Sequence, residues 1–403
     1  MQSRAIVARP GARARVLLLL SSLHGGGAER VAVHLLNNMD RERFDVRMGL
    51  LRAAGPWLAE ADQSRIVVAP ASERFVFEGT NASFYRPARL VAGITGAPLA
   101  FRTMVAQTQP HVVMSFLKGT SLAAWASLLG LRSRRPRFIV REGNNTLAVI
   151  DEELSNPIAR LGVRRLTARA YRAADRVLPN SSDLAASMVR DLGVDPTRVR
   201  VINNPVDLGR VRERAREPLP IVRPRPFVLT VGRLEHQKGQ DLLLRAYAAS
   251  KTRATHDLVV IGRGTLEASL RALSADLGVA GQVHFEGFVD NPWAWMAKAD
   301  LFVLPSRWEG FPTVAVEALA VGVPALLSDC PFGPRDVLEH GVSGWIVPAE
   351  DASALREGMD HLIANPVLRA GLVQRGSGRV ERFGLPAMVA CYEDLFAEQA
   401  ALA

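Results

Sequence analysis

Short apolar runs alternate with helix-like segments along the whole sequence, and this alternation restricts the fold more than any other feature. Nearly continuous apolar runs are typical of parallel strands that are buried on both faces of a sheet. The pattern therefore predicts an α/β protein with two doubly wound, Rossmann-like domains built on parallel sheets. The strands are predicted at residues 16–21, 46–51, 112–116 and 138–141, and then at 227–231, 257–261, 283–285, 301–305 and 324–328.

The length of 403 residues exceeds what one hydrophobic core usually supports, which also favours two domains. Residues 210–226, RVRERAREPLPIVRPRP, are predicted to be a linker because they hold four prolines and no sustained apolar face. Ligands of doubly wound sheets bind beyond the carboxyl ends of the strands, so two facing domains would form a ligand cleft between their loops. The expected parts are a basic flexible tail (1–14), an N-terminal domain (15–209), the linker (210–226), a C-terminal domain (227–385) and a helix packing back toward the N-terminal domain (386–403).

The composition argues for a cytoplasmic protein without a membrane span, since no run of about 20 apolar residues occurs. The run at residues 16–23 follows several arginines, as in an export signal, but it is short and HGGGAER follows it instead of a cleavage site. A buried first strand is therefore the favoured interpretation. Cys330 and Cys391 form neither a metal motif nor a disulfide framework, which fits a reducing compartment.

The net charge of +10 is concentrated in one half of the chain. Residues 1–220 carry 33 basic and 19 acidic side chains, a net of +14, whereas residues 221–403 carry 17 and 21. The most basic segment, 158–177, is predicted to be an amphipathic helix with an arginine face and an apolar face containing Ile158, Leu161, Leu166, Tyr171 and Ala174. That arginine face is either simply solvated or contacts an anionic membrane surface. The membrane-surface candidates are Arg160, Arg164, Arg165 and Arg169.

The segment HGGGAER directly follows the first predicted strand and precedes a helix at residues 31–38. Glycines there let backbone N–H groups approach an anion at the positive end of a helix. The dinucleotide fingerprint would require a third glycine where Arg30 stands, so a hydride-transfer site is not supported. A tight turn that binds no ligand is the alternative.

The segment VGRLEHQKGQD lies between a predicted strand and a helix, and it contributes Arg233 and Lys238 from one loop. Two cations at the end of a strand would neutralise a diphosphate and stabilise a leaving group as it gains charge. The alternative is a pair of ordinary surface side chains.

The segment RWEGFPTVAVEALAVGVP places Glu309 in a loop before a helix and Glu317 on the second turn of that helix. A carboxylate accepts hydrogen bonds from two sugar hydroxyls at once, and a phosphate would sit on the helix N-terminus between the two glutamates. The alternatives are a solvated glutamate pair, or the acid and nucleophile of a hydrolase. Apolar neighbours surround Glu317 in the sequence, so we expect it to have a partner.

Taken in order, the motifs GGAER, VGRL…KG, IGRG, EGF, PSRWEGFP…E and ALAVGVP resemble the family 4 retaining glycosyltransferases of GT-B architecture over nearly the whole chain. The resemblance implies that Glu317 binds the ribose, Glu309 the transferred sugar, and Arg233 with Lys238 the diphosphate. Glu309, Arg233 and Lys238 are thus the catalytic candidates. Other donor contacts implied by the resemblance are Gly26, Gly27, Gly262, Phe288, Val289, Gly310, Phe311 and Pro312.

The segment 328–347, SDCPFGPRDVLEHGVSGWIV, is similar to one in branches of the family that transfer N-acetylhexosamines, notably N-acetylgalactosamine, in lipopolysaccharide or lipid-linked oligosaccharide assembly. Asp336 stands where glutamate is usual in that segment. The resemblance implies a UDP-sugar donor and a lipid-linked or polysaccharide acceptor.

Many relatives place a histidine beside the transferred sugar, but the corresponding region here reads FIVREGNNT and contains none. The acceptor-side candidates are therefore Arg141, Glu142 and Asn144. In this family the donor phosphate itself usually takes the acceptor proton, with departure and attack on one face. No D-x-D motif occurs, so we expect neither a metal nor a cofactor.

The sequence thus favours a retaining glycosyltransferase that moves a hexosamine or hexose from a UDP-sugar to a lipid-linked or polysaccharide acceptor at the inner face of the membrane. One alternative is a nucleotide-sugar epimerase or hydrolase of the same architecture. A second is a non-enzymatic basic protein that binds membranes or nucleic acid. For the glycosyltransferase itself we expect no nucleic-acid partner.

Overall fold

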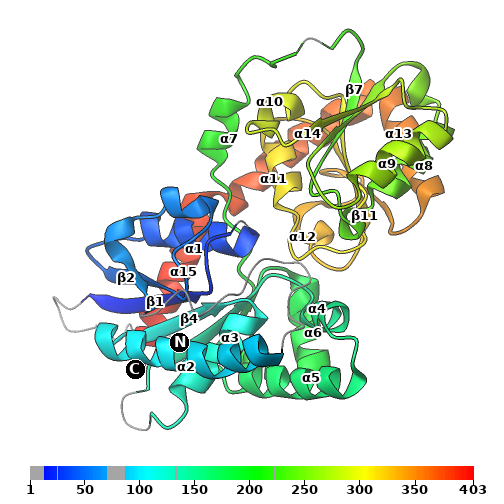
Figure 1. The fold of residues 1–403 in the computed structure, drawn as a ribbon. Coiled ribbons are helices and arrows are strands. Elements are labelled where there is room, and N and C mark those ends of the chain that lie inside the picture. Colours follow the sequence, from blue (N-terminus) through cyan, green and yellow to red (C-terminus); the bar gives the residue numbers. More distant parts are fainter. Residues whose placement is uncertain (1–12, 25, 70–86, 132–134, 222) are drawn as a thin grey trace. The chain divides into compact units, whose positions relative to one another are not determined.

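The computed structural model describes residues 13–24, 26–69, 87–131, 135–221 and 223–403. Within them the chain forms two compact units, each built on a six-stranded parallel sheet (Figure 1). Unit 2 comprises Val206–Leu385, and unit 1 comprises the chain before it together with Pro386–Ala403. The prediction of two doubly wound, Rossmann-like domains is confirmed.

Unit 1 has the strand order β3-β2-β1-β4-β5-β6, with every strand parallel to its neighbours. Five consecutive residues of β1, VLLLL, are buried, as expected for a central strand covered on both faces. Its strands are β1 (Ala14–Leu20), β2 (Phe44–Leu50), β3 (Ile66–Val68), β4 (Val112–Phe116), β5 (Arg137–Glu142) and β6 (Arg176–Pro179). Its helices are α1 (Gly27–Asn38), α2 (Pro87–Thr108), α3 (Lys118–Leu128), α4 (Thr146–Glu153), α5 (Pro157–Arg172), α6 (Ser182–Leu192) and α15 (Leu385–Ala400).

Unit 2 has the strand order β12-β11-β10-β7-β8-β9. Alternate residues of β7 enter two separate core clusters, Phe227 and Leu229 in one and Val228 in the other, so helices cover both faces of this sheet. Its strands are β7 (Phe227–Val231), β8 (Asp257–Ile261), β9 (Val283–Gly287), β10 (Leu301–Leu304), β11 (Ala325–Asp329) and β12 (Trp345–Pro348). Its helices are α7 (Leu208–Arg214), α8 (Gln240–Ala249), α9 (Glu267–Asp276), α10 (Pro292–Met296), α11 (Thr313–Ala320), α12 (Pro334–Val337), α13 (Ala352–Ala364) and α14 (Pro366–Arg379).

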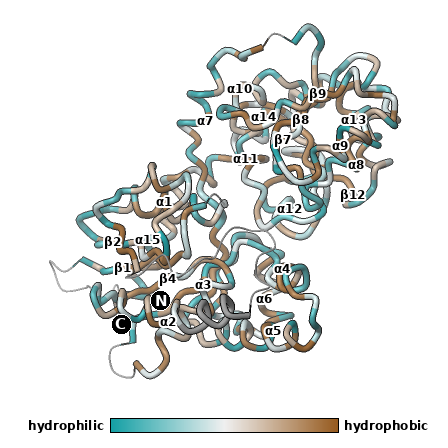
Figure 2. Tube along the Cα trace, viewed as in Figure 1, coloured by the Kyte–Doolittle hydropathy of each residue, from teal (hydrophilic) through white to brown (hydrophobic). Residues whose placement is uncertain are grey.

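Hydrophobic residues gather along the strands and on the helix faces that cover them, whereas hydrophilic residues lie mainly on the outer turns (Figure 2). Each sheet reverses its strand order once, between β1 and β4 in unit 1 and between β7 and β10 in unit 2. Ligands of doubly wound sheets bind at such reversals, beyond the carboxyl ends of the strands. A ligand site of unit 2 is therefore expected at the loops after β7 and β10.

The predicted linker at 210–226 is wrong in its first part, because residues 208–214 form helix α7 within unit 2. Asp207 caps this helix by accepting a hydrogen bond from the backbone N–H of Arg210, and Val211 is fully buried. One buried valine among arginines is too weak an apolar pattern to be read as a helix from sequence. Of the expected tail, residues 1–12 lie outside the described residues, and β1 already begins at Ala14.

The predicted helix at 158–177 ends earlier, at Arg172, because residues 176–179 form strand β6. Its apolar residues also face differently from the prediction. Ile158, Leu161 and Leu166 are exposed, whereas Tyr171 is buried in the core together with Thr167 and Ala170. The short strands β3, β6 and β12 were not predicted, since three or four residues give no clear period.

Helix α15 belongs to unit 1 from Pro386 onward, and its first residue, Leu385, is the last residue of unit 2. Tyr392, Leu395 and Phe396 are buried there, and Glu393 accepts a hydrogen bond from the backbone N–H of Asp40. Among the helices that the structure describes, none has the length and apolar character needed to cross a membrane.

Candidate functional site

Lys238 and Glu309 meet at the strand reversal of unit 2. Lys238 follows β7 and Glu309 follows β10, and the Lys238 Nζ lies 2.6 Å from the Glu309 Oε1. Their side chains are 14% and 7% exposed, so the ion pair is largely shielded from water. Two residues singled out from separate motifs are thus in direct contact at the edge of the sheet where ligands of this fold bind.

Glu309 is held in place from several sides. The Ser306 hydroxyl donates to the same Oε1 at 2.6 Å. The backbone of Glu309 also donates to the Pro331 carbonyl at 2.7 Å and accepts from the Phe332 N–H at 3.0 Å. These bonds tie the loop after β10 to the loop after β11, so the carboxylate has one fixed position.

The loop that carries the two predicted cations is joined to the Glu309 loop by Gln237. Its side-chain amide donates to the Trp308 carbonyl at 2.9 Å and accepts from the Arg233 Nη2 at 3.0 Å. Arg307 adds a second link, because its guanidinium makes two hydrogen bonds to Asp241 at 2.9 and 2.8 Å. Arg233 itself is exposed, so its remaining donors face solvent.

Glu317 lies on α11 and is only 6% exposed. The helix begins at Thr313 with Pro312 before it, close to the predicted start. Phe311 is buried and packs edge-on against Phe383, with ring centroids 5.3 Å apart. Gly310 and Pro312 are buried as well, so the backbone between the two glutamates is rigidly held.

The remaining donor-side candidates of unit 2 end neighbouring strands. Gly262 follows β8 with φ of +142°, and a Cβ there would lie 1.8 Å from the Gly232 carbonyl oxygen. Only glycine allows this approach of the loops after β7 and β8. After β9, Phe288 is 69% exposed, whereas Val289 packs against the core. All of these loops lie at the carboxyl edge of one parallel sheet.

Cys330 lies beside the Lys238–Glu309 pair and is buried. Burial raises the pKa of its thiol, and the negative charge of Glu309 raises it further. The thiol is therefore protonated and unreactive at neutral pH.

In unit 1, Gly26 and Gly27 lie at the start of α1, as predicted for the glycine-rich segment. The Glu29 carboxylate folds back onto this turn, and a Cβ on Gly26 would lie 2.5 Å from the Glu29 Oε2. Burial raises the pKa of Glu29, although backbone N–H groups, Arg141 and His24 partly oppose this. The helix start thus already holds a carboxylate in this structure.

The three acceptor-side candidates lie together at the end of β5 and in the turn that follows it. Glu142 is 2% exposed, and its Oε1 accepts from the backbone N–H groups of Gly143 and Asn144. The Glu142 Oε2 accepts from the Tyr171 hydroxyl at 2.6 Å. Burial raises the pKa of Glu142. Both of its oxygens are engaged inside the unit, while Asn144 is half-buried.

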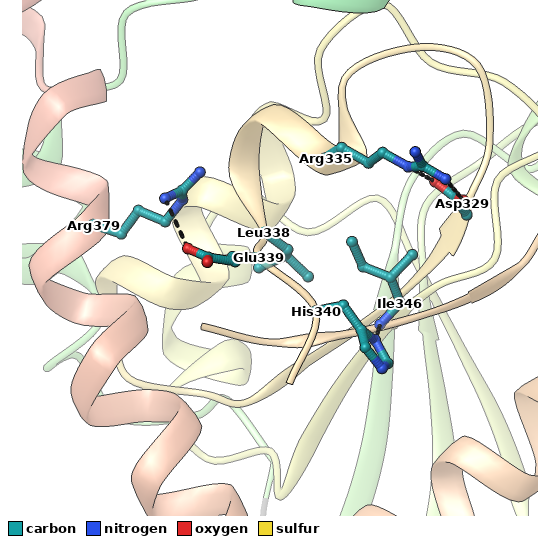
Figure 3. A pocket seen from close by; sticks show the side chains of 7 residues that line it. All are labelled: Asp329, Arg335, Leu338, Glu339, His340, Ile346 and Arg379. Atoms are coloured by element: carbon teal, nitrogen blue, oxygen red, sulfur yellow. Dashed lines mark hydrogen bonds and ion pairs between the residues drawn. The ribbon is translucent and has the colours of Figure 1, made fainter. Parts of the chain in front are cut away.

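A separate pocket of unit 2 is lined by residues of the segment 328–347, which resembles the hexosamine branch, together with Arg379, and it contains none of the predicted donor contacts (Figure 3). Arg335 makes two hydrogen bonds to Asp329, at 2.7 and 2.5 Å, and Arg379 lies 3.6 Å from Glu339. The charges of this pocket neutralise one another. Its lining consists of Asp329, Arg335, Leu338, Glu339, His340, Ile346 and Arg379.

The described part of the chain contains no group of three or more His, Cys, Asp or Glu side chains placed to hold a metal ion.

Sequence reasoning missed the residues that hold the site together. Gln237 and Ser306 lie within the motifs and are detectable there only as polar residues close to Lys238 and Glu309. Tyr392 and Asn204, which contact Arg141, lie far from it in sequence and carry no local signal.

Two doubly wound, Rossmann-like units, with charged and glycine-rich loops at the strand reversals, form the GT-B architecture. Residues 25–210 match the model of Glycosyltransferase Family 4, and residues 211–379 match that of Glycosyl transferases group 1. The chain belongs to these glycosyltransferases.

Relatives support this assignment over most of the chain. The chain is 30% identical over 260 residues to the N-acetylgalactosamine-N,N'-diacetylbacillosaminyl-diphospho-undecaprenol 4-alpha-N-acetylgalactosaminyltransferase of Campylobacter jejuni, which covers 62% of this chain and 70% of that protein. It is 28% identical over 375 residues to the lipopolysaccharide core biosynthesis glycosyltransferase LpsE of Rhizobium meliloti, which covers 93% of this chain and 96% of that one. The solved structure of Anabaena HepE in complex with UDP and glucose has the same fold, with a TM-score of 0.74, 18% identity and coverage of 96% and 100%.

Proposed function

We propose that this glycosyltransferase moves a hexosamine or hexose, with retention of anomeric configuration, from a UDP-sugar to a lipid-linked or polysaccharide acceptor. The observation that carries the proposal is the Lys238–Glu309 pair at the strand reversal of unit 2. The names of the relatives favour lipid-diphosphate or lipopolysaccharide acceptors, and the UDP complex of HepE favours a UDP donor. N-acetylgalactosamine is the donor sugar we favour, from the Campylobacter relative and the segment 328–347.

In this proposal Arg233 and Lys238 bind the diphosphate, and the exposed guanidinium of Arg233 has donors available for it. Glu309 contacts the hydroxyls of the transferred sugar, and Glu317 contacts the ribose. Backbone N–H groups at Gly310 and Phe311 contribute near the start of α11. Gly262, Phe288 and Val289 line the nucleoside end, while Gly26, Gly27 and Pro312 complete the donor contacts.

The proposed reaction breaks the bond between the anomeric carbon and the diphosphate, and forms a bond from that carbon to the acceptor oxygen on the same face. The acceptor proton passes to the departing phosphate oxygen, so UDP leaves protonated and no protein base is needed. Lys238 and Arg233 stabilise the charge that develops on the diphosphate. We propose that the reaction needs no metal and no cofactor.

On the acceptor side we propose that Arg141 and Asn144 contact substrate, while Glu142 keeps the turn at residues 143–144 in shape. This division follows from the internal bonds of Glu142, whose oxygens accept two backbone N–H groups and the Tyr171 hydroxyl. Glu142→Gln should therefore alter stability more than acceptor affinity.

The test is UDP release by the purified chain, measured with candidate UDP-sugars in the presence and absence of lipid-linked saccharides. Release should depend on acceptor, survive EDTA, and fall by about 100-fold or more in Lys238→Ala and Glu317→Ala. Lys298→Ala and Glu357→Ala change the same residue types at exposed positions and should retain activity. Normal turnover in both site variants would contradict the site, and complete conversion of donor without acceptor would favour the epimerase or hydrolase alternative.

We also propose that α5 attaches the protein peripherally to the inner face of an anionic membrane. Ile158 is 82% exposed on this helix, and Leu161 and Leu166 are 49% and 45% exposed. Arg165 and Arg169 are exposed beside them. Apolar side chains flanked by cations suit the headgroup region of a bilayer.

Two of the predicted membrane arginines are engaged within the protein, since Arg160 and Arg164 both pair with Asp151 of α4. Charge reversal at Arg165 and Arg169 should therefore weaken flotation with anionic vesicles more than reversal at Arg190, an exposed arginine of α6. Equal flotation of all variants would contradict the membrane proposal. Salt-dependent vesicle binding without any saturable UDP-sugar binding would favour the non-enzymatic alternative.

A further inference from the structure

Arg141 of unit 1 is a buried cation whose hydrogen-bond partners are neutral. Its residue is 1% exposed. The Arg141 Nε donates to the Tyr392 hydroxyl at 2.7 Å, and its Nη2 donates to the Asn204 Oδ1 at 2.6 Å. The guanidinium also lies over the Phe116 ring, 5.6 Å from its centroid. Among the described residues no carboxylate forms an ion pair with it, which is unusual because a buried charge without a counter-charge is costly.

Glu29 is an acidic side chain that acts on Arg141 through space. This carboxylate bonds to backbone N–H groups at the start of its own helix, α1, and burial raises its pKa. Burial thus disfavours the charged form of Glu29, which is the form that would act as a counter-charge to Arg141. Functional sites commonly retain such an uncompensated charge, because the ligand supplies the missing counter-charge.

The third nitrogen of the guanidinium, Nη1, makes no hydrogen bond to any residue that the structure describes. The space beside Nη1 is kept by Gly143, since a Cβ on this residue would lie 3.5 Å from it. The Asn180 Nδ2 lies 3.2 Å from the same Cβ position and donates to the Gly143 carbonyl, and Asn180 is 2% exposed. Its Oδ1 also lacks a partner among the described residues. Two buried residues close to Gly143 thus each have one polar atom without a partner, the Arg141 Nη1 donor and the Asn180 Oδ1 acceptor.

We propose that Arg141 binds a phosphate oxygen of a substrate through Nη1, and that Tyr392 and Asn204 are positioning residues that hold the guanidinium for this contact. A phosphate supplies the counter-charge that Arg141 lacks within the protein, and the planar guanidinium offers it a hydrogen-bond donor in a fixed position. The Asn180 Oδ1 accepts a hydroxyl of the same substrate. The inference rests on the proposed function, because a UDP-sugar and a lipid diphosphate both bring a phosphate.

The role of Tyr392 gives helix α15 a function beyond packing. Tyr392 lies on this helix, 251 residues after Arg141 in the chain, and its hydroxyl accepts a hydrogen bond from the Arg141 Nε. If that acceptor is removed, the guanidinium loses one of the two bonds that fix its plane. Loss of a hydrogen bond to a charged group corresponds to about a tenfold change in affinity or more.

The experiment is isothermal titration of the full chain, first with UDP and then with inorganic pyrophosphate at saturating UDP. If Arg141 binds the acceptor phosphate, pyrophosphate binds the UDP-saturated wild type, and its Kd rises about tenfold or more in Arg141→Gln and Tyr392→Phe while the Kd of UDP is unchanged. If Arg141 binds the donor phosphate, the Kd of UDP itself rises by that factor in both variants. An unchanged Kd of UDP, together with absent or unchanged pyrophosphate binding, overturns the proposal.

Tyr247→Phe is the matched control, because this buried tyrosine of unit 2 also loses one hydrogen bond, to the His256 carbonyl. It should leave both Kd values within about twofold of wild type. Under steady-state conditions Tyr392→Phe should raise the KM of one substrate selectively. A merely structural role would lower the active fraction, and hence the apparent kcat, with both KM values unchanged.

Gly143→Ala tests the same site without removing any charge, in case Arg141→Gln does not fold. Its methyl group would cover Nη1 and should weaken phosphate binding by a similar factor, whereas normal binding in a folded Gly143→Ala protein counts against the site. Failure of the inference is separable from failure of the proposed function. In the first case Lys238→Ala still abolishes turnover while the Arg141 variants bind normally, and in the second the wild type shows no UDP-sugar turnover at all.

Discussion

The Lys238–Glu309 pair gives the sharpest test of the site in unit 2. The perturbation is a double-mutant cycle of Lys238→Met, Glu309→Gln and the double variant, which removes each charge with little change of shape. Each single variant leaves one unpaired charge in a largely buried position, because the two side chains are only 14% and 7% exposed.

The magnitude follows from the geometry. At 2.6 Å and an effective dielectric constant near 20, two unit charges attract by about 6 kcal/mol, and desolvation cancels most of this. We expect each single variant to lose about 3 kcal/mol of unfolding free energy, because an unpaired charge remains. The double variant should lose about 4 kcal/mol, which leaves a coupling energy of about 2 kcal/mol between the two residues.

Unfolding in urea, followed by tryptophan fluorescence, measures these losses in unit 2, where Trp293, Trp295, Trp308 and Trp345 lie. A loss of 3 kcal/mol corresponds to a fall in Tm of roughly 6–12 °C for a unit of this size. Lys298→Met, at an exposed position, is the control and should change stability by less than about 0.5 kcal/mol.

The cycle also has a binding readout, since UDP raises the Tm of any variant that still binds it. Both single variants and the double variant should show a smaller shift with UDP than the wild type. Additive stability losses, with a coupling energy below about 0.5 kcal/mol, would refute the argument that Lys238 and Glu309 form a shielded pair.

Three further predictions concern other residues. Burial raises the pKa of Glu29 above its value in the unfolded chain. Its contribution to folding stability is therefore favourable at low pH and is lost as the pH rises through the folded pKa. Glu29→Gln should raise the Tm at pH 7, with no difference from wild type below about pH 4.5. Gly333→Ala should cost more than about 1 kcal/mol in urea unfolding, because φ is +90° and a Cβ would lie 2.8 Å from a backbone carbonyl of the loop before α11. Gly341→Ala, at φ of +70° with open space around it, should cost less. Burial raises the pKa of Cys330, so a thiol reagent at pH 8 should label only Cys391 in the folded protein, and prompt labelling of both would contradict this.

The strands show how much of the secondary structure could be predicted from the sequence alone. The predicted bounds of β4, β7 and β8 agree with the structure, since each is a continuous apolar run between polar turns. Strand β6 was assigned to the preceding helix, because four residues after an arginine-rich segment continue its pattern. Apolar periodicity thus identifies long, buried elements and fails for short elements that directly follow another one.

The loops that carry the candidate donor residues of unit 2 could be located from the sequence, because they lie between predicted strands and helices. The contact between two of these loops could not be predicted. The contact between Lys238 and Glu309 spans 71 residues, and it depends on β7 and β10 being neighbours at the strand reversal. Strand order is a property of the assembled sheet, and no local pattern encodes it.

The α/β class, the two doubly wound domains and the positions of the glycine, arginine and glutamate motifs could all be predicted from the sequence, because each depends on residues close together in the chain. The exposure of Ile158, the place of α15 in unit 1 and the contact of Tyr392 with Arg141 across 251 residues could not. Burial and hydrogen bonding between distant residues depend on how the elements pack. The candidate phosphate contact at Arg141 therefore becomes visible only in the folded chain.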